Sequence, residues 1–167
     1  MGKYGMNEYY NEHLQAGLEY QDFVIDQLLR CGIFIGTYSS RKYQNEKGES
    51  ASGIEIKYDG RMKETGNVFI EVMEKSDARI ENFTRSGIFR KDNSWLYLVG
   101  DYDEAFLFSK RQLQTVYLSN VEAKNNGRPL WAGVKFKEIA TSRGFVYNLE
   151  VAMSRGTVLR HFVFNDK

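Results

Sequence analysis

The fold is decided by the segment GIEIKYDGRMKETGNVFIEVMEK, which spans residues 53–75. Its first part, 54–59, and its last part, 68–75, alternate between apolar and polar side chains. This period of two is typical of half-buried β-strands. The turn-forming residues Thr65-Gly66-Asn67 lie between the two runs. Two alternating runs around a short loop predict an antiparallel β-hairpin.

Acidic and basic side chains share one face of this predicted hairpin. Glu55, Lys57 and Asp59 lie on one face of the first strand, because side chains alternate along a strand. If Asp59 pairs with Phe69, then Glu71 is its diagonal neighbour, at roughly 7 Å between the backbones. Two close carboxylates raise each other's pKa unless a cation neutralises them, and Mg²⁺ prefers such oxygen ligands together with water and phosphate. The pattern fits metal-assisted phosphodiester hydrolysis, and equally a solvated sheet face with cross-strand Glu–Lys pairs.

The same segment resembles the core hairpin of the PD-(D/E)xK, or restriction-endonuclease-like, nucleases, especially small phage and bacterial members. In these proteins an Asp ends the first strand, and a Thr-Gly-Asn turn precedes a strand with a second acid. The resemblance covers residues 18–118, where Ser86-Gly87-Ile88 and Trp95-Leu96-Tyr97 are also similar. It implies an α/β fold with a mixed central β-sheet flanked by helices. It also implies a metal-dependent nuclease that hydrolyses phosphodiester bonds in DNA with Mg²⁺ or Mn²⁺.

The resemblance assigns roles to individual residues. Asp59 becomes the first metal-binding acid and Glu71 the second. The family places Lys or Glu two residues after the second acid, where this chain has Met73. The catalytic amine would then come from Lys75, through a bulge near Met73, or from Lys57 on the neighbouring strand.

Other acids extend or compete with this assignment. Glu19, on the first predicted helix, would add a metal ligand, although it also fits a solvated helix position. Glu55 would support the site. Alternatively, Glu55-Ile56-Lys57 spells the E-x-K pattern of the family itself, with Glu49 as the earlier acid.

Basic side chains recur beyond the hairpin. They are Arg85, Arg90, Lys91, Lys110, Arg111, Lys135, Lys137 and Arg143. Such patches contact phosphates, and nearby aromatic rings stack on unpaired bases. The net charge of +1 is low for a duplex-binding domain, so any contact with DNA must be local, and a mixed solvated surface is the alternative.

The remaining pattern predicts one domain over residues 1–167, with a loose start at 1–12. We expect a helix near 14–31, a short strand at 33–35, a polar loop at 37–52, a short helix at 77–83, strands at 95–99 and 105–108, a helix beginning after Ser109, a loop at 120–129, and strands within 131–136, 145–151 and 158–164. The uninterrupted apolar run at 95–99 predicts a central strand buried on both faces.

Several broader expectations follow. A polar N-terminus and the lack of an apolar run of roughly 18 residues favour a cytoplasmic protein without a membrane span. The single Cys31 makes no internal disulfide.

Many nucleases of the family dimerise, so a homodimer is an open expectation. Met73 and the low net charge favour an alternative, a catalytically inactive nuclease-fold module that binds nucleic acid or protein. An assembly or regulatory protein of a phage or mobile element is a third interpretation.

Overall fold

The computed structural model describes residues 4–37, 47–48 and 50–164, with only the backbone for 4–14. In chain order the elements are α1 (Tyr4–Arg30), β1 (Ile54–Tyr58), α3 (Met62–Thr65), β2 (Asn67–Glu74), β3 (Thr84–Arg85), the 3-10 helix η1 (Gly87–Phe89), β4 (Leu96–Gly100), β5 (Glu104–Ser109), α4 (Lys110–Asn125), β6 (Val134–Glu138), β7 (Ser142–Asn148), α5 (Leu149–Ser154) and β8 (Val158–Val163).

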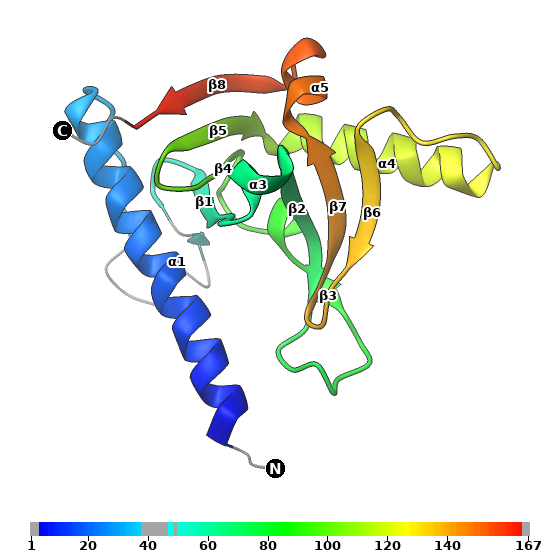
Figure 1. Cartoon of the computed structure of the whole chain (residues 1–167), viewed down its shortest axis with the longest axis horizontal. Helices are drawn as coiled ribbons and strands as arrows, with labels where there is room; N and C mark the ends of the chain where they lie inside the picture. Colours follow the sequence, from blue (N-terminus) through cyan, green and yellow to red (C-terminus); the bar gives the residue numbers. More distant parts are fainter. Residues whose placement is uncertain (1–3, 38–46, 49, 165–167) are drawn as a thin grey trace.

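The strands form two four-stranded sheets (Figure 1). The first has the order β1-β4-β5-β8 and is mixed, because β1 runs parallel to β4 whereas the other pairs are antiparallel. The second has the order β3-β2-β7-β6 and is antiparallel. The predicted α/β class with a mixed sheet and flanking helices is therefore confirmed, but the strands divide between two sheets.

The predicted β-hairpin is wrong, because β1 and β2 lie in different sheets. Ile54 of β1 pairs with Leu96 of β4, whereas β2 pairs with β3 and β7. The helical turn α3 separates the two strands, and Gly66 ends it in the left-handed conformation at φ 64°. Alternation shows which side chains of a strand are buried, but it does not show which strand lies alongside.

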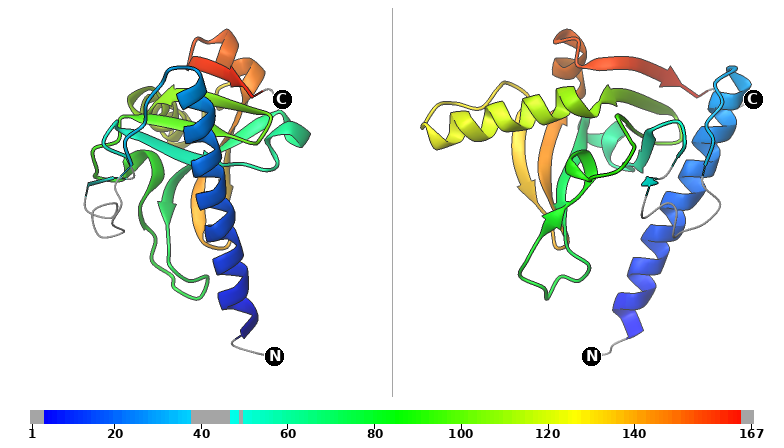
Figure 2. Two further views of the ribbon diagram at one scale, coloured as in Figure 1. Left: turned by 90° about the vertical axis from the view of Figure 1, so that its left-hand side faces the viewer. Right: turned by 180° about the vertical axis from the view of Figure 1, so that it is seen from behind.

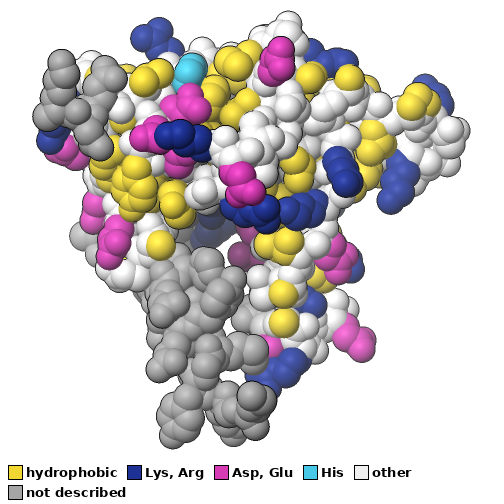
Figure 3. All heavy atoms as spheres, in the orientation of Figure 1, with side chains coloured by type: hydrophobic (Ala, Val, Ile, Leu, Met, Phe, Trp, Pro, Cys, Tyr) yellow, Lys and Arg dark blue, Asp and Glu magenta, His cyan; other side chains and the backbone are white. Residues whose placement is uncertain are grey.

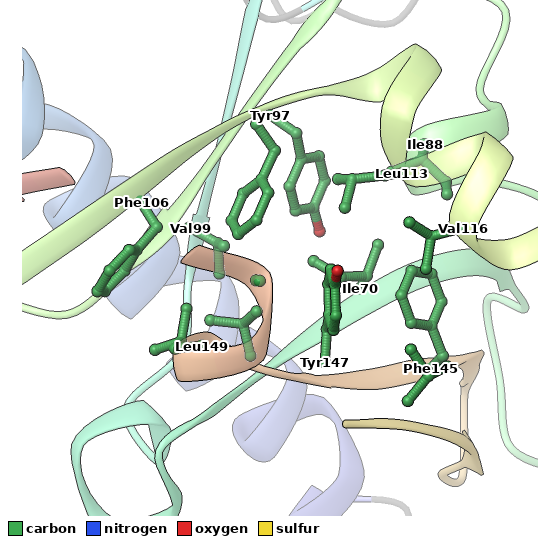
Figure 4. Packing of buried hydrophobic residues seen from close by; sticks show 14 of the residues in the cluster. Ile70, Ile88, Tyr97, Val99, Phe106, Leu113, Val116, Phe145, Tyr147 and Leu149 are labelled. Carbon is green, nitrogen blue, oxygen red and sulfur yellow. The ribbon is translucent and has the colours of Figure 1, made fainter. Parts of the chain in front are cut away.

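The first sheet lies between two apolar cores. On one face α1 contributes Tyr20, Val24 and Leu28, which are packed in one core with side chains of β1, β4 and β5. On the other face Tyr97 and Val99 pack against the second sheet and α4 (Figure 4). All five residues of β4 are buried, which confirms the predicted central strand. Figure 2 shows α1 along one side of the molecule and α4 extending past the second sheet.

Several helix boundaries differ from those predicted. α1 begins at Tyr4, so residues 4–12 are helical instead of loose, and 1–3 lie outside the described residues. Most of the predicted 37–52 loop also lies outside them. Residues 33–35 form no strand, and 77–83 form no helix.

Asparagine side chains lie near two further boundaries. α4 continues to Asn125, and Asn120, where a loop was predicted, is buried in it: its side chain donates to the Val116 carbonyl at 2.7 Å and accepts from the Trp131 N–H at 2.7 Å. β7 stops at Asn148 because its side chain caps α5, accepting from the Val151 N–H at 3.1 Å.

Within the part of the chain that is described, no helix has the length and apolarity needed to span a bilayer.

Candidate functional site

A buried carboxylate stands at the edge of the first sheet. Glu55 of β1 is 2% exposed and points away from the α1 side of the sheet. Its Oε1 lies 3.0 Å from Lys57 Nζ, and its Oε2 lies 2.6 Å from Lys110 Nζ. Burial alone raises the pKa of Glu55, but the ammonium groups of Lys57 and Lys110 more than offset it and lower the pKa to about 2. Glu55 is therefore a carboxylate at neutral pH.

Lys110 is a buried cation at the beginning of a helix. Its backbone N–H donates to the Trp95 carbonyl at 2.9 Å, and its side chain is 5% exposed. The N-terminus of a helix disfavours positive charge, so Lys110 requires anionic neighbours there. Besides Glu55, its Nζ lies 3.5 Å from Asp92 Oδ1 and contacts the Ser94 hydroxyl.

Asp92 extends this arrangement toward the surface. Its side chain is 3% exposed and lies 3.6 Å from Arg90 Nε, and it accepts from the Ser94 N–H at 2.9 Å and from the Ser94 hydroxyl. Arg90, Asp92, Lys110, Glu55 and Lys57 thus form a series of alternating charge, which we call the charge chain. Each buried charge in it contacts an opposite charge, as burial requires.

The outer end of the charge chain opens into a cavity of about 420 Å³. We call it the basic cavity, and its lining consists of Ile88, Arg90, Asp92, Ser94, Trp95, Ser109, Lys110, Arg111 and Gln114. Three of these side chains are cationic and one is anionic, so the lining carries net positive charge. Hydroxyl and amide groups supply further hydrogen-bond donors, and the size lies within the range of ligand sites.

Strand topology brings these segments together. Leu96, the first residue of β4, pairs with Ile54 at the start of β1 and with Ser109 at the end of β5. The loop before β4 and the first turn of α4 therefore meet at one end of the sheet. Asp92 and Ser94 lie in this loop before β4 and become part of the site for this reason.

The two acids predicted to bind metal have separate protein partners. Asp59 Oδ2 accepts from the Phe69 N–H at 2.9 Å and its Oδ1 accepts from the Arg61 N–H at 3.1 Å, so it ties the end of β1 to the start of β2. Glu71 accepts hydrogen bonds from the hydroxyls of Ser142, at 2.6 Å, and Ser86. The predicted pairing of Asp59 with Phe69 across a hairpin does not occur. Across the residues with described side chains, no three Asp, Glu, His or Cys groups are placed to hold a metal ion.

The other predicted site residues are only partly brought together. Lys57 contacts Glu55, as the E-x-K pattern indicates. The ladder of β2 and β7 is irregular between Glu71 and Met73, where a bulge was predicted. However, the Lys75 ammonium donates to the Ala78 carbonyl at 3.0 Å, within the segment that follows β2.

Glu19 lies apart from the charge chain. It is exposed and accepts from Gln15 Nε2 at 2.9 Å. It belongs to α1, which covers the face of the first sheet opposite to Glu55. Glu49, the earlier acid of the alternative assignment, lies outside the described residues.

Charges of both signs are interspersed on the face shown in Figure 3, which agrees with the net charge of +1. Comparison with protein-family models, curated proteins and solved structures gives no match. The functional argument therefore rests on the charge chain, the basic cavity and the sequence motif.

Proposed function

We propose that this chain binds nucleic acid and that the basic cavity contacts its phosphates. The observation that carries the proposal is the convergence of Arg90, Lys110 and Arg111 on one open cavity. Arginine, lysine and hydroxyl groups are the donors that most often contact phosphate oxygens. The distant segments that supply them meet only in the folded chain.

The charge chain prepares this cavity for an anion. Glu55 and Asp92 hold the Lys110 ammonium in place, so little side-chain entropy remains to be lost when a phosphate binds. Because Lys57 and Arg90 sit at the two ends of the chain, the five side chains together carry one net positive charge. Arg111 adds a second, so the local charge is positive although the whole protein is almost neutral.

Replacing two cavity arginines tests this proposal. We expect Arg90→Ala/Arg111→Ala to weaken binding of a labelled DNA oligonucleotide at least about 10-fold, because hydrogen bonds to charged groups contribute about 1.5–3 kcal/mol each. The slope of log K against log salt concentration should fall in magnitude by about 1.5, for two lost phosphate contacts. Fluorescence anisotropy across a salt series measures both quantities.

The matched control is Lys124→Ala/Arg128→Ala, which removes the same charge from the last turn of α4 and from the segment that follows it. It should change the affinity less than about 3-fold, because Lys124 lies roughly 20 Å along α4 from Lys110 at 1.5 Å per residue. Equal losses in both double variants would show that only bulk charge matters and would refute the cavity as the contact.

We propose metal-dependent DNA hydrolysis on a restriction-endonuclease-like fold as the second candidate function. The observation that favours it is the approach of Glu55 and Glu71 to one buried tyrosine. Burial raises the pKa of Tyr97 well above its usual value, and the Glu55 and Glu71 carboxylates raise it further. Glu55 of β1 pairs with Tyr97 of β4, and Lys57 contacts the Glu55 carboxylate.

The residues present fit a magnesium or manganese ion only if phosphate oxygens of the substrate and water supply most of its ligands. Mg²⁺ needs one or two protein carboxylates when water and phosphate oxygens complete its coordination. In this proposal Glu71 would be the metal-binding acid, because Asp59 is held apart from it by the Phe69 and Arg61 N–H groups. Lys57 would orient water near the phosphate, and a bound ion would supply Lewis-acid stabilisation of the charge that develops on the phosphate.

Cleavage of plasmid and single-stranded DNA with MgCl₂ or MnCl₂ tests this second function. We expect cleavage that EDTA stops and that Glu71→Gln and Lys57→Met each reduce at least about 100-fold, the scale of losing one catalytic electrostatic group. Glu81→Gln, at an exposed position, should retain full activity. Activity that survives in Glu71→Gln, or no cleavage with either metal, would eliminate this assignment and leave the binding proposal untouched.

A further inference from the structure

An aromatic ring is held in solvent at the rim of the basic cavity. Trp95 is 62% exposed, although it directly precedes a strand whose five residues are all buried. Its backbone is fixed on both sides: the N–H donates to the Gly53 carbonyl at 2.9 Å, and the carbonyl accepts from the Lys110 N–H at 2.9 Å. The exposure of this ring therefore does not come from a loose segment.

Gly53 packs against the Trp95 ring. It has φ 72°, and a Cβ built there would lie 2.5 Å from Trp95 Cδ1 and 2.6 Å from Nε1. The five-membered part of the indole thus rests directly on the Gly53 backbone, and only glycine leaves room for it. Trp95 also belongs to the lining of the cavity, together with Arg90 and Lys110.

We propose that Trp95 stacks on an unpaired base while the cavity cations hold the adjoining phosphates, so the ligand is single-stranded nucleic acid. This inference rests on the proposed nucleic-acid binding and narrows its substrate class. Fixed aromatic rings beside a positively charged groove are the arrangement by which proteins bind single strands, because every unpaired base offers a stacking face. A duplex keeps its base faces inside the helix. The cavity, at about 420 Å³, also has the size of a small-ligand site.

Three 12-nucleotide probes of equal charge separate stacking from phosphate contact. They are oligo(dT), the same length of oligo(U), and an abasic phosphodiester strand. We expect Trp95→Ala to weaken binding of the preferred oligonucleotide about 5-fold to 100-fold, as loss of one stacked base does, and to change abasic-strand binding less than about 2-fold. The preferred oligonucleotide is the tighter-binding of oligo(dT) and oligo(U).

The controls are Trp95→Phe and Tyr102→Ala. The phenylalanine variant retains a stacking face and should recover most of the affinity. Tyr102 is 40% exposed and follows the opposite end of β4, so its removal should leave the affinity within about 2-fold. A second readout uses Trp131→Phe, which leaves Trp95 as the chain's single tryptophan. Its fluorescence should be quenched by the oligonucleotide and not by the abasic strand.

The outcomes separate the two proposals. If no probe binds in a salt-sensitive manner, nucleic-acid binding itself is refuted. If salt-sensitive binding remains but the abasic strand binds as tightly as the preferred oligonucleotide, with no quenching of Trp95, only the stacking inference falls. Equal losses for oligonucleotide and abasic strand in Trp95→Ala would also overturn it, because the ring would then support the cavity instead of contacting a base.

Discussion

Lys110→Met is expected to lower the free energy of unfolding by about 3–5 kcal/mol, the usual cost of removing one partner of a buried ion pair. Methionine matches the length of the lysine stem but leaves Glu55 Oε2 without its cation at 2.6 Å. Asp92 loses its contact as well. The remaining charges cannot reach water because both carboxylate side chains are at most 3% exposed.

Urea denaturation followed by circular dichroism measures this effect, and Lys63→Met provides the matched control. Lys63 also contacts an acid, Asp103, but their side chains are 72% and 61% exposed. An exposed pair of this kind contributes about 0–1 kcal/mol. Adding Glu55→Gln to Lys110→Met should recover part of the loss, since it removes a buried carboxylate that only Lys57 would still neutralise. Similar midpoints for Lys110→Met and Lys63→Met would show that the charge chain does not stabilise the fold.

Gly87→Ala should destabilise the protein by about 2–5 kcal/mol, from left-handed backbone strain of about 1–2 kcal/mol and steric displacement of about 1–3 kcal/mol. Gly87 begins η1 with φ 49°, and a Cβ there would lie 2.2 Å from the Glu71 carbonyl oxygen. That atom belongs to the β2 backbone and cannot rotate away. The methyl group would push η1 from the strand and separate Ser86 from the Glu71 carboxylate.

Gly127→Ala isolates the steric part of this effect. Gly127 has a similar backbone conformation, with φ 64°, but a Cβ there meets nothing within 4 Å. It should therefore cost only the strain of about 1–2 kcal/mol. The difference between the two urea midpoints measures the close approach of η1 to β2. Equal destabilisation by the two substitutions would contradict that approach.

The sequence predicts most elements of the fold but not their partners. The apolar spacing of Val24 and Leu28 indicates the buried face of α1, and alternation indicates β1 and β2. Ser109 is indeed the residue before α4, although its side chain makes no capping hydrogen bond. Pairing of β1 with β4 joins segments about forty residues apart, and no local pattern specifies such a contact.

The local contacts of the candidate site were predictable from the sequence, but its long-range contacts were not. Glu55 and Lys57 are two residues apart on one strand, so their contact follows from local geometry. The predicted pairing of Asp59 with Glu71 depended on the hairpin and was lost with it. In the sequence Lys110 resembles an exposed lysine at the start of a helix. Its burial depends on Glu55 of β1, whose carboxylate contacts it only in the folded chain.

The position of β4 has a consequence for how the chain loses its structure. Its alternate side chains belong to different cores: Leu98 packs on the α1 side, and Tyr97 packs on the side of the second sheet. Neither core can unfold alone, because displacing β4 exposes apolar surface in both cores. We therefore expect unfolding to be cooperative over both sheets, so that a substitution in either core lowers the stability of both.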